Sequence, residues 1–209
     1  MILTLIFNPY PNHIYPVFVP LLMSTIAERI KELTSVQHQA AEDSLIPRIT
    51  GIRSVKDYVA VLHCFYGFFH PLLGKIHQVL TSQDLPDIAQ RRSTDLIQLD
   101  LRNLNYPDNH IPISTELPGI QSTADAFGAL YVVEGSTLGG KVIRKMLLQQ
   151  NAVPLTESCL NFFDAYGPET VSRWRSFQQA LNRQPDTEPI VSTAQQTFTL
   201  FNTWINQTI

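Results

Sequence analysis

The chain has 209 residues, of which 44% are apolar and 16% are charged. This balance is typical of one globular domain with a substantial core and excludes an extended disordered chain. The formal net charge is −3, from 15 basic and 18 acidic residues, and no basic block occurs, which argues against nucleic acid as a partner. The two cysteines, Cys64 and Cys159, lack metal-ligand spacing and fit a reduced, cytoplasmic protein.

Residues 1–22 differ in composition from the rest of the chain. They are apolar and aromatic, contain four prolines and lack lysine and arginine. A signal peptide normally begins with a positive segment, and a membrane helix needs about 20 continuous apolar residues, which prolines interrupt. We therefore expect a disordered or loosely docked extension over residues 1–22 and no membrane segment. One folded domain is expected over residues 23–209, beginning at a Thr25–Glu28 capping box.

Beyond residue 23 the apolar residues recur at helical spacing, without an alternating strand and hairpin turn. The expected helices cover about residues 26–41, 54–80, 87–104, 122–150, 168–181 and 188 onward. Capping patterns mark the second and fourth starts, and Pro71 is expected to kink the second helix. The predicted fold class is all-α, a single-domain helical bundle with one core.

The first predicted helix carries a candidate metal ligand. At 100° per residue, Lys31, His38 and Glu42 fall on one stripe beside the apolar face. A neutral imidazole facing a pocket can ligate haem iron, and a carboxylate one turn away can orient the ring, directly or through water. Lys31 lies roughly 10 Å from His38 along the axis, which suits a cation at the rim of a flat ligand. The competing interpretation is a half-buried surface histidine paired with a carboxylate.

A glycine-rich stretch lies inside the fourth predicted helix, where Gly135, Gly139 and Gly140 fall within six positions. Each interior glycine costs about 1 kcal/mol relative to alanine, so the set needs a reason. One reason is a flat ligand held against backbone that lacks Cβ atoms, with Gly139 and Gly140 as a hinge. The other is close packing between helices through small residues. The residues alone leave both reasons open.

Together the two patterns resemble the biliverdin-producing haem oxygenases of the bacterial, bacteriophytochrome-associated type. The resemblance is carried by Lys31, Glu32, Thr34, His38 and Glu42, and by the sequence Gly-Ala-Leu-Tyr-Val-Val-Glu-Gly-Ser-Thr-Leu-Gly-Gly over residues 128–140. Weaker matches extend it over nearly all of the chain after residue 23, at Asp100–Leu101, Tyr166–Gly167, Trp174 and Phe177.

The resemblance implies a role for each candidate residue. His38 is the expected proximal iron ligand, with Glu42 beside it. The expected catalytic segment is a kinked distal helix that presses backbone against haem and selects the carbon to be attacked; its residues are Gly135, Ser136, Gly139 and Gly140.

The remaining candidates surround the same ligand. Lys31 and, second, Arg175 are the expected cations for the haem propionates, and Arg173 is expected to face elsewhere. Tyr131 and Phe198 are candidates for the pocket wall, although aromatic residues at helical spacing commonly belong to a core.

The resemblance also implies a reaction and its partners. Haem is both cofactor and substrate, and O2 with external electrons opens it to biliverdin, CO and ferrous iron. The expected electron donor is a ferredoxin, a flavodoxin or a reductase, and a bacteriophytochrome is the candidate acceptor of biliverdin.

Ser136 departs from the wider family, in which many members carry an aspartate at this position. Serine donates and accepts hydrogen bonds but carries no charge, so the residues that deliver protons are not assigned. Two alternatives stay open. One is a protein that sequesters or delivers haem without turnover. The other is a haem-free enzyme such as a thiaminase-like hydrolase, for which only fold-level analogy speaks.

Overall fold

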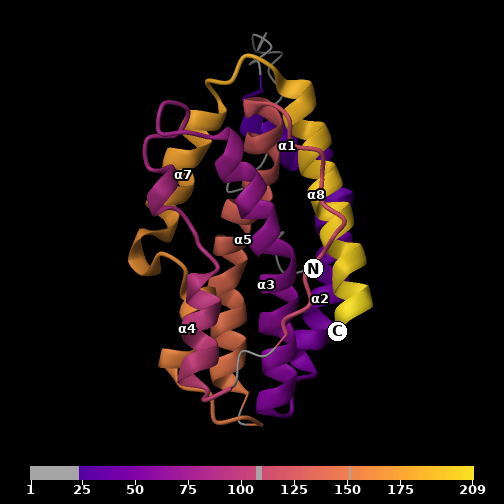
Figure 1. Cartoon of the computed structure of the whole chain (residues 1–209), viewed down its shortest axis with the longest axis vertical. Coiled ribbons are helices and arrows are strands. Elements are labelled where there is room, and N and C mark those ends of the chain that lie inside the picture. The colour runs from indigo at the N-terminus through magenta and orange to yellow at the C-terminus, as the bar shows by residue number, and fades with distance from the viewer. Residues whose placement is uncertain (1–23, 107–109, 151) are drawn as a thin grey trace, which may run out of the picture.

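The computed structural model describes residues 24–106, 110–150 and 152–209, so the extension predicted at residues 1–22 lies outside the described residues. Within these ranges the chain is helical without strands, as predicted, and forms an elongated bundle (Figure 1). The α-helices are α1 (Ile26–Leu33), α2 (Ser35–Thr50), α3 (Val55–Val79), α4 (Asp95–Asn103), α5 (Thr123–Gln149), α6 (Asn161–Asp164), α7 (Thr170–Leu181) and α8 (Thr187–Thr208). Short 3-10 turns are η1 (Ile88–Gln90), η2 (Glu157–Cys159) and η3 (Gly167–Glu169).

Three helices begin at capping boxes that the sequence predicts. In α1, α3 and α5 the cap residue is Thr25, Ser54 or Ser122, and its side chain accepts the N–H of the acidic residue three positions later. The carboxylate of that acidic residue accepts the N–H of the cap in return. Each box thereby satisfies donors that a helix start leaves free.

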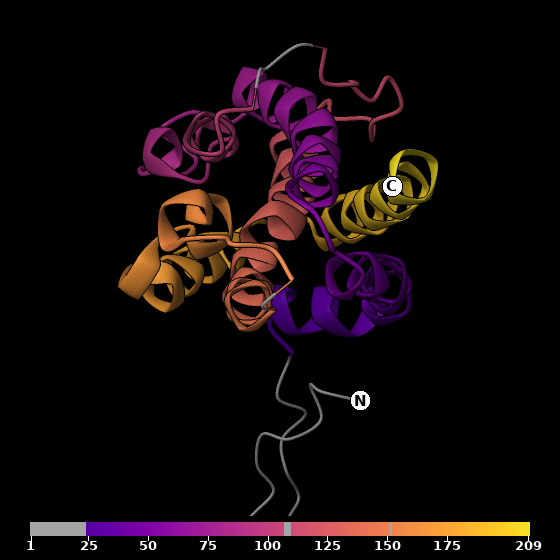
Figure 2. The ribbon, with the colours of Figure 1, turned by 90° about the horizontal axis from the view of Figure 1, so that it is seen from below.

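Helix α5 lies at the centre of the bundle. It packs against α3, α6, α7 and α8, and Figure 2 shows it between α7 on one side and α1 with α2 on the other. Gly128 permits the closest approach, because a Cβ at this position would lie 2.3 Å from the carbonyl oxygen of Ile190 on α8. The backbones of α5 and α8 are therefore in direct contact.

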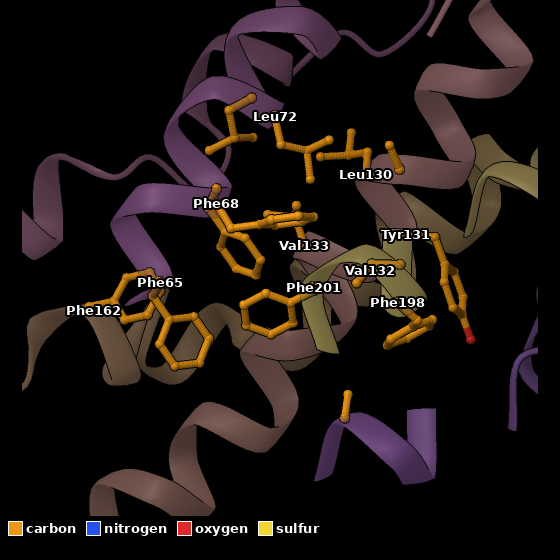
Figure 3. Packing of buried hydrophobic residues seen from close by; sticks show 14 of the residues in the cluster. Phe65, Phe68, Leu72, Leu130, Tyr131, Val132, Val133, Phe162, Phe198 and Phe201 are labelled. Carbon is orange, nitrogen blue, oxygen red and sulfur yellow. The ribbon is translucent and has the colours of Figure 1, made fainter. Parts of the chain in front are cut away.

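An aromatic core fills the space between α3, α5, α6 and α8 (Figure 3). The ring centroids of Phe65 and Phe162 lie 5.2 Å apart, as do those of Phe68 and Phe201. These separations are normal for packed aromatic rings. This core holds one side of α5 in place.

The first predicted helix is two helices that meet at Thr34. The Thr34 hydroxyl donates to the carbonyl of Ile30 at 2.7 Å, and its backbone has φ −103° and ψ 2°, outside ideal helical values. The predicted end at residue 41 was also too early, because α2 continues through Pro47 to Thr50. As a result Lys31 lies on α1 and His38 lies on α2.

The third predicted helix, over residues 87–104, is also interrupted. Residues 91–94 lie outside any helix, between η1 and α4. Arg91 has an extended backbone with φ −81° and ψ 170°, and the side chains of Arg91 and Arg92 are both buried. Helix α3, by contrast, is one helix across Pro71.

Among the described helices, α3 alone is long and apolar enough to cross a membrane, with a mean hydropathy of 1.3 in its most apolar stretch. Of that stretch, 61% is buried inside the bundle. Such burial is expected of the central helix of a helical core.

Candidate functional site

His38 presents a partly open imidazole on α2. Its side chain is 47% exposed, and its ring packs edge-on against Phe198 of α8, with centroids 5.4 Å apart. Its Nε2 lies 3.8 Å from Oε1 of Glu42, which is longer than a hydrogen bond, so the two side chains are neighbours without a direct hydrogen bond. A ring held at one edge and open elsewhere can bind a metal ion that a ligand brings to it.

Tyr131 and Phe198 lie side by side at the border of the core (Figure 3). Both are largely buried. The Tyr131 ring packs on Trp174 of α7 at 5.4 Å, and burial raises the pKa of its phenol to about 12. Phe198 is therefore the member of the pair that contacts His38, and the pocket-wall role of both residues stays a prediction.

The glycines of α5 divide into two kinds, although the helix runs without interruption from Thr123 to Gln149. A Cβ at Gly140 would lie 2.7 Å from the carbonyl oxygen of Phe163 on α6, so this glycine serves helix packing. A Cβ at Gly139 would meet nothing within 4 Å, and one at Gly135 would meet only the Trp174 ring at 3.7 Å. Close helix packing thus explains Gly140, and the flat-ligand interpretation stays a prediction for Gly139.

The two predicted cations converge on one pocket. Lys31 from α1 and Arg175 from α7 line a pocket of about 420 Å³, together with Thr25, Ala27, Glu28, Gln178, Gln179 and Asn182. Arg173 faces elsewhere, as predicted, and pairs with Asp87 and Glu169. Cations on two helices at one pocket favour a ligand with carboxylates.

The sequence interpretation missed a buried ionic network that joins Glu134 of α5 to Arg91 and Tyr166. Glu134 is fully buried; its Oε2 accepts from Nη1 of Arg91 at 2.8 Å, and its Oε1 accepts from the Tyr166 hydroxyl at 2.8 Å. Arg91 is also paired with Asp87. Burial raises the pKa of Glu134, against the opposing effect of Arg91, and burial with the charge of Glu134 raises the pKa of Tyr166. The sequence held one indication of this network, because Glu134 directly follows a run of apolar residues that ends at Val133.

Arg92 joins this network to Ser136. Its Nη1 donates to Ser136 Oγ at 2.6 Å and its Nη2 donates to the Phe162 carbonyl at 3.0 Å. Its backbone N–H donates to the Tyr166 hydroxyl. The Ser136 hydroxyl in turn donates to the carbonyl of Val133 at 2.7 Å. Ser136 is therefore held in place by a buried cation.

Asp100 holds the start of α6, from which Phe162 reaches Arg92. Its carboxylate accepts three hydrogen bonds of 2.8–2.9 Å, from the backbone and side chain of Asn161 and from the backbone of Phe162. Burial nevertheless raises the pKa of Asp100. The match at Asp100 in the sequence thus marks a structural anchor for α6.

These residues fit a haem group. Among the described residues no three His, Cys, Asp or Glu side chains converge on a possible metal site. A single imidazole such as His38 is enough for haem, because the porphyrin nitrogens supply the equatorial ligands. The open space at Gly139 and the paired cations Lys31 and Arg175 match a flat ring with carboxylates at one edge.

The chain is similar in sequence and in fold to known proteins. A family model described as Heme oxygenase matches residues 24–207. A curated Heme oxygenase of Xanthomonas campestris pv. campestris (strain 8004) is 37% identical over 95 residues, which is 45% of this chain. The match spans 53%, about half, of the length of that relative.

Two solved structures share the fold at low identity. The heme oxygenase of Neisseria meningitidis, solved in NO- and CO-bound forms, has a TM-score of 0.72 and 18% identity, covering 88% of this chain and 92% of that chain. The heme oxygenase of Leptospira interrogans has a TM-score of 0.66 and 17% identity, covering 88% and 100%. Because the family model matches residues 24–207, the chain belongs to the heme oxygenase family.

Proposed function

We propose that this chain is a haem oxygenase, which uses O2 and external electrons to open haem to biliverdin, CO and ferrous iron. One observation carries the proposal. Lys31 and Arg175, from α1 and α7, line one pocket, while His38 on α2 offers an open imidazole beside an aromatic wall. A planar, dicarboxylate ligand that carries a metal matches this set of groups.

His38 would hold the iron through its imidazole, and Glu42 beside it would favour positive charge on that ring. When bound, haem supplies the iron at which O2 is reduced, and with it most of the chemistry. Lys31 and Arg175 bind the propionates and thereby fix the rotation of the ring in its plane. These contacts decide which edge of the ring faces α5.

Helix α5 would contribute a second wall of the site. The open backbone at Gly139 and the Gly135 backbone beside Trp174 allow close approach to a planar ligand. Tyr131, Phe198 and Trp174 exclude water from the neighbouring space because they pack into the core. Ser136 lies in the same segment and offers its Oγ as a fixed polar atom.

A second candidate function is haem binding without turnover, for sequestration or delivery. It is favoured by the lack of a free carboxylate beside Ser136 among the described residues. The neighbouring carboxylate, Glu134, is fully buried and already accepts from Arg91 and Tyr166, so it does not offer a free acid to the ligand. Persistence of haem under reductant and O2 would support this candidate.

The proposed partners follow from the chemistry and from the resemblance. The reaction needs an external electron donor, and a ferredoxin, a flavodoxin or a reductase is proposed. Both cysteines are free and buried, which supports a reducing, cytoplasmic setting. A bacteriophytochrome as acceptor of biliverdin stays a prediction from the resemblance.

The experiment is a spectroscopic titration of the purified chain with haemin, followed by turnover. We expect a Soret band for a six-coordinate ferric species in the wild type, which His38→Ala loses or shifts, and biliverdin absorbance after reductant and O2 are added. His77→Ala, at an exposed position on α3, is the control. A His38→Ala protein with an unchanged Soret band would contradict the proposal.

A further inference from the structure

Arg92 is a buried cation without a carboxylate partner. Its side chain packs over the Phe162 ring with the guanidinium carbon 3.9 Å from the ring centroid, and the residue is 4% exposed. Its hydrogen bonds go to neutral oxygens, on Ser136 and Phe162. Its Nε is buried and has no hydrogen-bond partner. Within residues 24–106, 110–150 and 152–209, no salt bridge joins Arg92 to a carboxylate.

The adjacent arginine shows that such a partner was available. Arg91 takes both neighbouring carboxylates, pairing with Asp87 at 2.9 Å and with Glu134 at 2.8 Å. Glu134 has its second oxygen bound to Tyr166. Arg92 is thus left with an excess positive charge inside the protein.

This charge persists at neutral pH. Burial lowers the pKa of Arg92 to about 10, although the nearby charge of Glu134 opposes that effect, so the guanidinium stays protonated near pH 7. An unpaired buried charge strongly destabilises a fold. A bound ligand that carries negative charge would offset that cost.

The charge reaches α5 through Ser136. Arg92 Nη1 donates to Ser136 Oγ, and the hydroxyl hydrogen of Ser136 is engaged by Val133. The orientation of Ser136 is therefore fixed from both sides. Ser136 lies within one turn of Gly139, the position of α5 at which a Cβ would meet nothing within 4 Å.

We propose that Arg92 is a positioning residue of the haem pocket, which fixes the Ser136 hydroxyl and makes the α5 side of the pocket favour anionic ligands over neutral ones. The inference rests on the proposed function, because it concerns ligands that bind to the haem complex.

The test compares an anionic and a neutral ligand of ferric haem, azide and imidazole, in spectroscopic titrations of the haem-loaded protein. Arg92→Met removes the charge, and we expect the dissociation constant for azide to rise about tenfold while that for imidazole stays within about twofold. Arg92→Lys keeps a positive charge and is expected to retain most of the azide affinity. Arg173→Gln removes a cation that is paired with Asp87 and Glu169, and is expected to leave both ligands unaffected.

A second pair of variants leaves Arg92 in place. Ser136→Asp puts a carboxylate within reach of Arg92 and neutralises the charge of the arginine. The dissociation constant for azide is therefore expected to rise as it does in Arg92→Met. Ser136→Asn has the shape of the aspartate variant without its charge, and its azide affinity is expected to exceed that of Ser136→Asp by about tenfold. This pair decides the matter if Arg92→Met does not fold.

The outcomes separate this inference from the proposed function. An equal rise in the dissociation constants of azide and imidazole would show a structural role only and would overturn the inference. An azide dissociation constant that does not change with the charge at positions 92 and 136 would overturn it as well. A wild-type chain that binds no haem would overturn the proposed function, and this inference with it.

Discussion

The neighbouring glycines Gly139 and Gly140 allow a matched test of where a ligand meets α5. Both lie inside one helix, so alanine gains the same helix propensity at either position, about 1 kcal/mol. Their surroundings differ. A Cβ at 139 meets nothing within 4 Å, whereas a Cβ at 140 would lie 2.7 Å from the Phe163 backbone oxygen.

We therefore expect opposite effects on the haem-free protein. Gly139→Ala should raise the free energy of unfolding by about 0.5–1 kcal/mol, which corresponds to about 1–4 °C in Tm for a chain of this size. Gly140→Ala should lower it, because the steric cost of about 1–3 kcal/mol in a packed interior exceeds the gain in propensity. Urea and thermal unfolding of the haem-free proteins measure both changes.

For Gly139→Ala, the effect on haem binding is expected to be opposite in sign to the effect on stability. The added methyl group occupies the space in which the ring approaches the backbone, so we expect haem affinity to fall about tenfold, or about 1.4 kcal/mol, in a variant that is more stable without haem. A Gly139→Ala protein that is stabilised and binds haem as the wild type does would refute the placement of the ligand against this turn. A destabilised haem-free variant would refute the open space itself.

The remaining predictions concern the rim and a helix start. Lys31→Ala and Arg175→Ala should each lower haem affinity by about two- to fivefold, the effect expected of exposed charges, and this loss should shrink at high salt. Lys75→Ala, at an exposed position, is the control. An equal loss of affinity in all three variants would argue against propionate binding at this pocket. The N–H of Arg53 and the Ser54 side chain lower the pKa of Asp57. Its stabilising effect is therefore present above the unfolded pKa near 3.9 and is lost as pH falls through the folded pKa. The free energy of unfolding of Asp57→Asn should thus lie below that of the wild type at pH 7 and approach it below about pH 4; a gap independent of pH would contradict the assignment.

The parts of the fold that follow from local chemistry were predictable. The three capping boxes need only residues three positions apart, and the apolar spacing of α3, α5 and α8 survives in the structure. The helix interrupted at Arg91 and Arg92 was predicted wrongly, because two adjacent charges normally mark a solvated helix surface. Here they leave the helix to bury their side chains behind α5, which only distant residues such as Glu134 and Phe162 make favourable.

The candidate site was predictable in composition but not in detail. His38 and Glu42 could be paired by helical spacing, and Lys31 and Arg175 could be named from the resemblance, yet their meeting at one pocket depends on how α1 and α7 pack. The sequence also could not separate Gly139 from Gly140, because the difference lies in the position of Phe163 on another helix. The cation beside Ser136 was missed for the same reason.

The break between α1 and α2 at Thr34 places Lys31 and His38 on separate helices. Lys31 belongs to α1, whose start is tied to α7 by the hydrogen bond from Ala27 to Asn182, while His38 belongs to α2. In the proposed site, the distance from Lys31, which would bind a carboxylate, to His38, which would bind iron, is therefore set by the angle at the buried Thr34 instead of by the rise of a straight helix. We expect a substitution of Thr34 to change which tetrapyrrole dimensions the proposed site accepts, while every side chain proposed to touch the ligand keeps its identity.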